Sequence, residues 1–75
     1  MTLEIRLFAY LREGRGKKVY LDIVPGETCV QDVLDRLEII PEHVSLLLIN
    51  GKDAEKSSVF SEGDYLTIFP PVGGG

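Results

Sequence analysis

The sequence predicts an α+β fold in which a single mixed β-sheet carries one main helix packed across one of its faces. Hydrophobic and polar residues alternate in two N-terminal segments and again near the C-terminus, and this period of two is typical of strands with one buried face. A central segment instead repeats its hydrophobic residues at the spacing of an amphipathic helix. These elements follow one another within 75 residues, which predicts one small domain.

Composition and charge narrow the possible functions. The chain carries 12 acidic and 8 basic residues, a formal net charge of −4, and this balance argues against a nucleic-acid partner. A single cysteine excludes an intramolecular disulfide and a zinc cluster built from thiolates, and we expect no bound metal. No hydrophobic run approaches the roughly 20 residues that span a bilayer, so we expect a cytoplasmic protein without a membrane segment.

The two N-terminal segments are predicted to pair as an antiparallel hairpin. The first strand covers residues 3–9, the connection includes residues 13–16, and the second strand follows. The hydrophobic positions of the two strands are Leu3, Ile5 and Leu7, then Val19, Leu21 and Ile23. The basic residues around the connection are Arg12, Arg15, Lys17 and Lys18. Such charges fit a solvated loop better than a phosphate-binding or partner-binding site.

A helix of about three turns is predicted after the turn at residues 25–27. Thr28 is its predicted N-cap, because Gln31 stands three residues later at the spacing of a capping box. The hydrophobic stripe of this helix consists of Val30, Val33, Leu34 and Leu37. The helix should end around residues 38–40, because Pro41 cannot continue it.

The C-terminal half is predicted to add further strands. Residues 44–49 are almost continuously hydrophobic, which indicates a central strand covered on both faces, and the Asn50-Gly51 turn follows it. The polar segment 52–60 is compatible with a short edge strand or a helical turn. After a turn at residues 61–64, the last strand covers residues 65–69.

Neither the single cysteine nor the single histidine is predicted to be catalytic. Cys29 lies in the first turn of the predicted helix, where a thiol can be activated, but no base stands beside it in the sequence. We therefore interpret Cys29 as a half-buried structural residue and His43, next to Glu42, as a surface residue.

Two antiparallel strands, a crossover helix and then a strand beside the first define the β-grasp arrangement. Because one helix covers only one face of the sheet, the other face should be open to solvent. That face would carry Phe8, Tyr20, Tyr65 and Phe69. Clustered exposed aromatic residues are typical of protein interfaces, so we interpret this face as a protein-binding surface.

The chain divides into a predicted β-grasp domain over residues 1–69 and a C-terminal tail over residues 70–75, Pro-Pro-Val-Gly-Gly-Gly. Two consecutive prolines cannot donate ladder hydrogen bonds, so they end the last strand and keep the chain extended. Three glycines then remove every side chain, which suits insertion into a narrow cleft that acts on the carboxylate of Gly75. A frayed terminus or a cloning remnant is the alternative interpretation of the glycines.

The sequence resembles the MoaD/ThiS family of ubiquitin-like sulfur-carrier proteins over essentially its whole length. The matching segments are Leu7-Phe8-Ala9-Tyr10-Leu11-Arg12-Glu13, Pro25-Gly26-Glu27-Thr28 leading into Val33-Leu34, Ile49-Asn50-Gly51, Gly63-Asp64, and Phe69-Pro70-Pro71-Val72 before the glycines. The phenylalanine and the two prolines before the glycines are most similar to the small subunit of molybdopterin synthase.

The resemblance implies a function for the tail. The carboxylate of Gly75, with Gly74 beside it, would be adenylated by an ATP-dependent activating enzyme related to ubiquitin activators and converted to a thiocarboxylate. The sulfur would pass to the cyclic pterin precursor held by the large subunit of molybdopterin synthase, within a heterotetramer of two small and two large subunits. The residues that contact these partners would be Phe8, Tyr65, Phe69, Pro70, Pro71, Val72 and Gly73. The chain would hold no permanent cofactor and would catalyse little alone.

Other functions stay open. The connection between Tyr10 and Lys18 is shorter than in the molybdopterin subunit, which leaves sulfur carriers for thiamin, tRNA thiolation or another pathway as alternatives. A ubiquitin-like modifier or docking domain is an alternative of a different class. An autonomous enzyme fits least, because one histidine and one cysteine supply no catalytic cluster.

Overall fold

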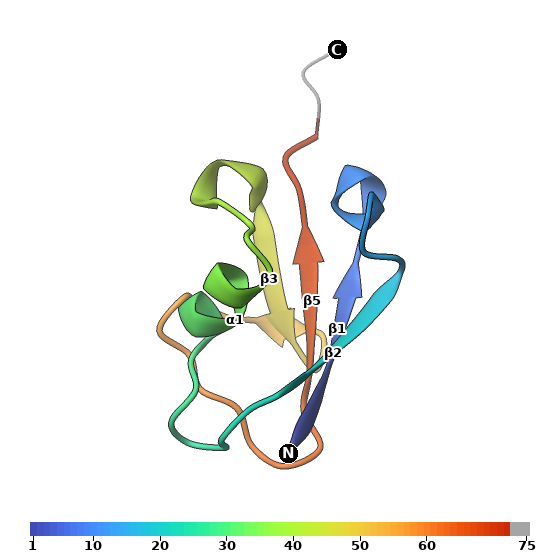
Figure 1. Cartoon of the computed structure of the whole chain (residues 1–75). Coiled ribbons are helices and arrows are strands. Elements are labelled where there is room, and N and C mark those ends of the chain that lie inside the picture. Colours follow the sequence, from blue (N-terminus) through green and yellow to red (C-terminus); the bar gives the residue numbers. More distant parts are fainter. Residues whose placement is uncertain (73–75) are drawn as a thin grey trace.

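A five-stranded sheet with one α-helix against one face makes up residues 1–72, the part of the chain that the computed structural model describes (Figure 1). The strands are β1 (Thr2–Leu7), β2 (Lys18–Asp22), β3 (Leu46–Ile49), β4 (Lys52–Asp53) and β5 (Tyr65–Phe69). Helix α1 spans Val30–Arg36, and the short 3-10 helices η1 and η2 cover Ala9–Arg12 and Pro41–His43. The predicted α+β architecture is confirmed.

The strand order across the sheet is β2-β1-β5-β3-β4. β1 pairs antiparallel with β2, as the predicted hairpin requires, and parallel with β5. β3 runs antiparallel to both β5 and β4. The parallel neighbour of β1 is therefore the last strand and not β3, the first strand after the helix. Because β1 and β5 run in the same direction, both end at the same edge of the sheet.

The hydrophobic core lies between the sheet and α1. Alternate residues of β1 and β5 face the helix, and all of them are fully buried: Leu3, Ile5, Leu7, Leu66 and Ile68. Helix α1 adds Val30, Val33 and Leu34, which belong to the predicted stripe. Phe60 is also buried, at 1% exposure, so the segment 52–60 contributes a core side chain that its polar composition conceals.

The helix begins one residue later and ends earlier than predicted. Cys29 is the N-cap, and the Asp32 carboxylate accepts a hydrogen bond of 3.0 Å from the Cys29 amide, so the predicted pairing of Thr28 with Gln31 is wrong. The Thr28 hydroxyl instead accepts a bond from the Val24 amide in the preceding turn. This local bond closes the turn, and the N-cap position passes to the next residue.

The end of α1 is set by a backbone reversal that sequence periodicity does not show. Glu38 adopts a left-handed conformation with φ of 58°, and the Ile39 amide donates to the Leu34 carbonyl over 3.0 Å. This is the Schellman pattern of a helix C-terminus. The two hydrophobic residues that it joins, Leu34 and Ile39, are both buried. The helix therefore stops at Arg36, several residues before Pro41.

β3 is covered on one face only, which corrects the prediction of a strand buried on both sides. Leu47 faces the core at 8% exposure, whereas Leu46 is 41% exposed on the opposite face. The physical reason is the position of the single helix, which leaves one side of the whole sheet open (Figure 1). Asn50 and Gly51 join β3 to β4 with φ of 53° and 81°, which confirms the predicted turn.

No helix in residues 1–72 is both long enough and hydrophobic enough to cross a membrane.

The cap of α1 gives a pH-dependent prediction. Hydrogen bonds from the Cys29 amide and thiol hold the pKa of Asp32 below its ordinary value, so the charged carboxylate favours the folded state. We expect Asp32→Asn to lower the urea midpoint at pH 7, because this contribution is present above the unfolded pKa and is lost as pH falls through the folded one. The two midpoints should converge in acid. Asp53→Asn on β4 is the control, and a pH-independent difference for Asp32→Asn would exclude a charged cap.

Candidate functional site

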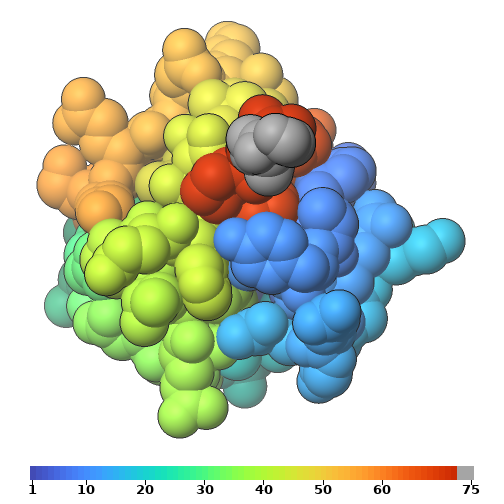
Figure 2. All heavy atoms as spheres, turned by 90° about the horizontal axis from the view of Figure 1, so that it is seen from above, coloured from blue at the N-terminus to red at the C-terminus, as the bar shows by residue number. Residues whose placement is uncertain are grey.

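The candidate site is a groove of about 820 Å³ at the edge of the sheet from which the tail leaves. Three segments that are distant in sequence line it: Phe8, Ala9 and Tyr10 after β1, Ser45 and Leu46 at the start of β3, and Phe69, Pro70, Pro71 and Val72 at the end of β5. Figure 2 shows the tail root, in red, between the N-terminal segment in blue and the β3 region in yellow-green. The groove is thus built around the first residues of the tail.

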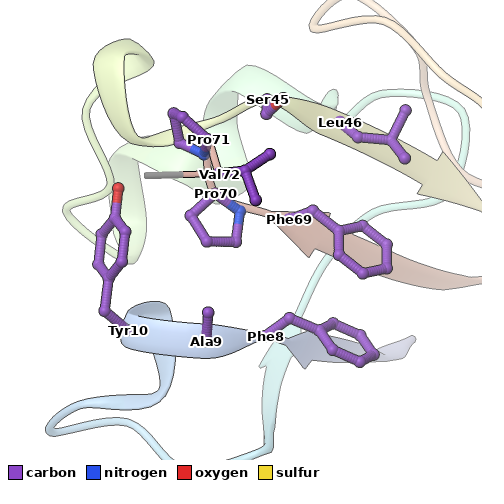
Figure 3. A pocket seen from close by; sticks show the side chains of 9 residues that line it. All are labelled: Phe8, Ala9, Tyr10, Ser45, Leu46, Phe69, Pro70, Pro71 and Val72. Atoms are coloured by element: carbon purple, nitrogen blue, oxygen red, sulfur yellow. The ribbon is translucent and has the colours of Figure 1, made fainter. Parts of the chain in front are cut away.

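Sheet register brings the two phenylalanines of the groove together. β1 pairs with β5 so that Arg6 lies opposite Thr67, and the next outward positions along the two strands are Phe8 and Phe69. Their rings stack with centroids 4.4 Å apart and an interplanar angle of 19°. Both side chains are half-buried on the open face, where the stack forms one wall of the groove (Figure 3).

The opposite wall depends on a backbone turn at Ala9. This residue adopts φ of 52°, a left-handed conformation that costs an alanine roughly 1–2 kcal/mol. The turn starts η1, whose Leu11 is buried at 1% exposure and anchors it to the core. Tyr10 then stands at the rim, and its ring meets His43 of η2 edge-on at 5.4 Å. In Figure 3 the small Ala9 side chain points toward Pro70 between Tyr10 and Phe8.

The tail leaves the sheet at Phe69. The Phe69 carbonyl still accepts a hydrogen bond of 2.8 Å from the Ser45 amide, which continues the β3–β5 ladder. Pro70 then ends the ladder because it has no N–H to donate. Val72 is 94% exposed, so a hydrophobic side chain stands in solvent beside the groove. Gly73, Gly74 and Gly75, the remaining predicted site residues, lie outside the described residues.

The four aromatic residues predicted for the open face occupy two different places on it. Phe8 and Phe69 line the groove, whereas Tyr65 lies at the other end of β5, and the Arg6 guanidinium covers its ring at 3.9 Å. Tyr20 is 58% exposed on β2. The structure therefore brings together Phe8, Phe69 and the tail root but not Tyr65. It adds Ala9, Tyr10, Ser45 and Leu46, which sequence patterns did not single out.

Arginines flank the aromatic residues of the open face. Arg6 Nε donates to Glu4 Oε2 at 2.6 Å, and Lys18 Nζ lies 3.9 Å from the same oxygen. The hydrogen bond from Arg6, together with the charge of Lys18, lowers the pKa of Glu4. Arg12 Nε donates to the Leu7 carbonyl at 2.8 Å, and its guanidinium lies 5.0 Å from the centroid of the Phe8 ring.

The loop before β2 is more structured than a solvated loop. Arg15 donates hydrogen bonds to the Leu11 carbonyl at 3.2 Å and to the Leu37 carbonyl at 3.1 Å, which ties the loop to the end of α1. Within the predicted loop, Arg12 and Arg15 thus hold backbone carbonyls and are not simply extended into solvent.

The single cysteine and the single histidine lie outside the lining of the groove. Cys29, the N-cap of α1, does not line it, and His43 reaches it only through Tyr10. Within residues 1–72 there is no group of three His, Cys, Asp or Glu residues placed to hold a metal ion. Its lining is instead aromatic and aliphatic side chains with the polypeptide running out beside them, which is the composition of a protein-binding surface.

Comparisons with known proteins identify a family, and solved structures share the fold. The model of the ThiS family matches residues 5–75. Small archaeal modifier protein 3 from Haloferax volcanii is 32% identical over the full length of both chains. The crystal structure of SAMP1 from Haloferax volcanii superposes with a TM-score of 0.79 at 31% identity, covering 100% of each chain. A chain of the complex of subunits 1 and 2 of the molybdopterin-converting factor from Helicobacter pylori has a TM-score of 0.67 at 17% identity, again over both full chains.

The aromatic stack can be tested by a double-mutant cycle. We expect Phe8→Ala and Phe69→Ala to be non-additive, with a coupling free energy of about 0.5–1.5 kcal/mol, the range measured for aromatic pairs. Urea unfolding of the wild type, both single variants and the double variant gives this quantity. Strict additivity would show that the two rings pack independently.

Proposed function

The chain belongs to the ThiS family of ubiquitin-like sulfur carriers, and we propose that it carries sulfur as a thiocarboxylate at Gly75 for molybdopterin biosynthesis. The observation that carries this proposal is the groove at the root of the tail. Phe69-Pro70-Pro71-Val72 leaves the sheet beside a stacked aromatic pair, and three glycines follow it in the sequence. A partner that holds the groove would receive the end of the chain in its own active site.

The chemistry divides between this chain and its partners. A carboxylate oxygen of Gly75 attacks the α-phosphorus of ATP, pyrophosphate leaves, and an acyl adenylate forms. Hydrosulfide then attacks the acyl carbon, AMP leaves, and loss of the S–H proton gives the thiocarboxylate. Activation is required because a free carboxylate is a poor acyl donor, and the partner enzyme supplies the ATP site. Glycine at the last positions lets the chain thread a narrow cleft.

The final acceptor in this proposal is the pterin precursor of molybdopterin. The sequence Phe69-Pro70-Pro71-Val72 before the glycines supports this choice through its resemblance to the small subunit of molybdopterin synthase. The fold is shared with subunit 1 in the Helicobacter pylori complex, and that protein assembles with a subunit 2. A large subunit of the same kind would hold the acceptor and dock on the groove.

A second candidate function is attachment to other proteins. The relative named small archaeal modifier protein 3 is 32% identical over both full chains, a closer match than the molybdopterin-converting subunit at 17%. A modifier would use the same adenylate, but a lysine amine would displace AMP and form an isopeptide bond. The two functions share activation and differ in the nucleophile that receives the acyl group.

Activation can be tested at the tail. We expect Gly74→Val and Gly75→Val each to abolish ATP–pyrophosphate exchange by the activating enzyme of the same organism, because a β-branched side chain adds bulk where the cleft is narrow. Thermal unfolding should not change, because both positions follow the last strand. Ser57→Val, which places the same valine side chain at an exposed site, is the control. Normal exchange by the two glycine variants would refute activation at Gly75.

Docking can be tested at the groove with a matched pair of variants. Leu46 and Val24 are 41% and 51% exposed, but only Leu46 lines the groove. We expect Leu46→Glu to weaken binding to the activating enzyme on the order of tenfold or more, because it places a charge in a hydrophobic interface. Val24→Glu should bind as the wild type does in isothermal titration. Equal effects of the two variants would exclude the groove as the docking surface.

A further inference from the structure

Two arginines lie beside aromatic rings on the open face next to the groove, and hydrophobic docking alone does not explain them. We propose, on the basis of the proposed function, that Arg6 and Arg12 form bidentate pairs with carboxylates on the protein that binds the tail. The occupant of this face is therefore a protein surface with acidic residues placed beside a hydrophobic anchor. The arginines determine which partner binds and how it is oriented, and the groove supplies the buried area.

The first observation is a strong separation of charge along the chain. Five of the eight basic residues lie between residues 6 and 18, and Glu13 is the only acid there. Ten of the twelve acidic residues follow residue 20. The basic segment comprises the end of β1, η1 and the start of β2, which includes one wall of the groove. In a protein of net charge −4, this flank alone attracts an acidic surface.

The second observation is how the two guanidinium groups are held. Arg6 lies 3.9 Å from the Tyr65 ring centroid and Arg12 lies 5.0 Å from that of Phe8. Each uses Nε for a hydrogen bond within the domain, Arg6 to Glu4 and Arg12 to the Leu7 carbonyl. Among residues 1–72, no hydrogen bond engages the terminal nitrogens of either side chain. Each guanidinium is thus held near an aromatic ring by a hydrogen bond through Nε, and its terminal nitrogens remain able to donate.

A pre-oriented guanidinium fits a carboxylate especially well. The planar fork donates two parallel hydrogen bonds, and stacking on a ring removes part of the rotamer entropy that a free arginine loses on binding. Arginine and aromatic residues are also the types enriched at the energetic centres of interfaces. One fork lies beside the groove at Phe8, and the other, from β1, lies over Tyr65 at the start of β5, so together they would fix the rotation of a partner as well as its affinity.

A phosphate-rich partner such as nucleic acid fits these observations less well. Binding to nucleic acid depends on many cations neutralising a row of phosphates. Here Glu4 already neutralises part of the cluster, since both Arg6 and Lys18 lie within 4 Å of its carboxylate. Ten acidic residues on the rest of the chain would repel a polyanion. A protein with a few well-placed carboxylates avoids this repulsion.

The test compares three double variants in ATP–pyrophosphate exchange with the activating enzyme of the same organism. Arg6→Gln with Arg12→Gln removes two charges and both forks, and Arg6→Lys with Arg12→Lys keeps the charges but removes the forks. Lys52→Gln with Lys56→Gln is the control, because it removes the same charge from exposed positions that do not line the groove. Thermal unfolding of every variant identifies any loss of folded protein.

We expect the glutamine pair to raise the KM for this chain about tenfold at low ionic strength with kcat unchanged, because the lost contacts act in docking and not in chemistry. The lysine pair should fall between the glutamine pair and the wild type. The control should stay within about twofold of the wild type, and the differences should shrink in about 0.3 M salt.

Three other outcomes would contradict the arginine contacts, the proposed function or the choice of a protein partner. Equal KM values for the glutamine pair and the control would refute the arginine contacts while leaving activation intact. Exchange that is absent even for the wild type would refute the proposed function and, with it, this inference. Tighter binding of the wild type than of the glutamine pair to a fluorescent single-stranded oligonucleotide, with equal KM values, would assign the arginines to phosphate instead.

Discussion

The parallel pairing of the first and last strands is the constraint on which the site depends. Because β1 and β5 run side by side in one direction, residues more than sixty positions apart finish at the same sheet edge. That register places Phe8 beside Phe69, and the chain after Phe69 has to leave the fold next to their stacked rings. The groove proposed for docking and the chain end proposed for activation are therefore connected by topology. A partner that binds one is positioned to receive the other.

A sheet covered on one face only makes this surface available. Helix α1 buries Leu3, Ile5 and Leu7 and leaves the alternate positions open. Those positions carry aromatic rings and Arg6, which lies over Tyr65, and Arg12 of η1 lies beside the Phe8 ring. The pairing orders exposed side chains without burying them. Binding of the proposed partner to this face would therefore cost little further side-chain entropy.

The parts of the fold that follow from local periodicity could be predicted from the sequence. The alternation of Leu3, Ile5 and Leu7 gave the buried face of β1, and Asn50-Gly51 gave the β3–β4 turn, because both signals depend on neighbouring residues. The predicted helix cap was wrong because the Thr28 hydroxyl accepts a hydrogen bond from the Val24 amide in the preceding turn. The prediction that β3 is buried on both faces was wrong at Leu46, because a hydrophobic run does not reveal how many helices cover a sheet.

The residues of the groove also fall into those that local sequence patterns could predict and those that they could not. Phe8, Phe69 and the two prolines could be predicted as neighbours once β1 and β5 were placed together. Ala9 and Tyr10 could not, because the left-handed turn at Ala9 occurs at a residue type that gives no signal for it. Ser45 and Leu46 join the groove only through the antiparallel register of β3 with β5. The residues that were missed are those whose role depends on contacts between distant segments.

The central claim is that Gly75 ends in a thiocarboxylate, and the intact mass of the protein purified from its own organism tests this most directly. We expect a population heavier by the replacement of one oxygen with sulfur, absent when Gly75 is deleted. Protein found only with an unmodified end, or only joined to other proteins through lysine, would contradict the sulfur-carrier function. The second of these results would identify the chain as a modifier.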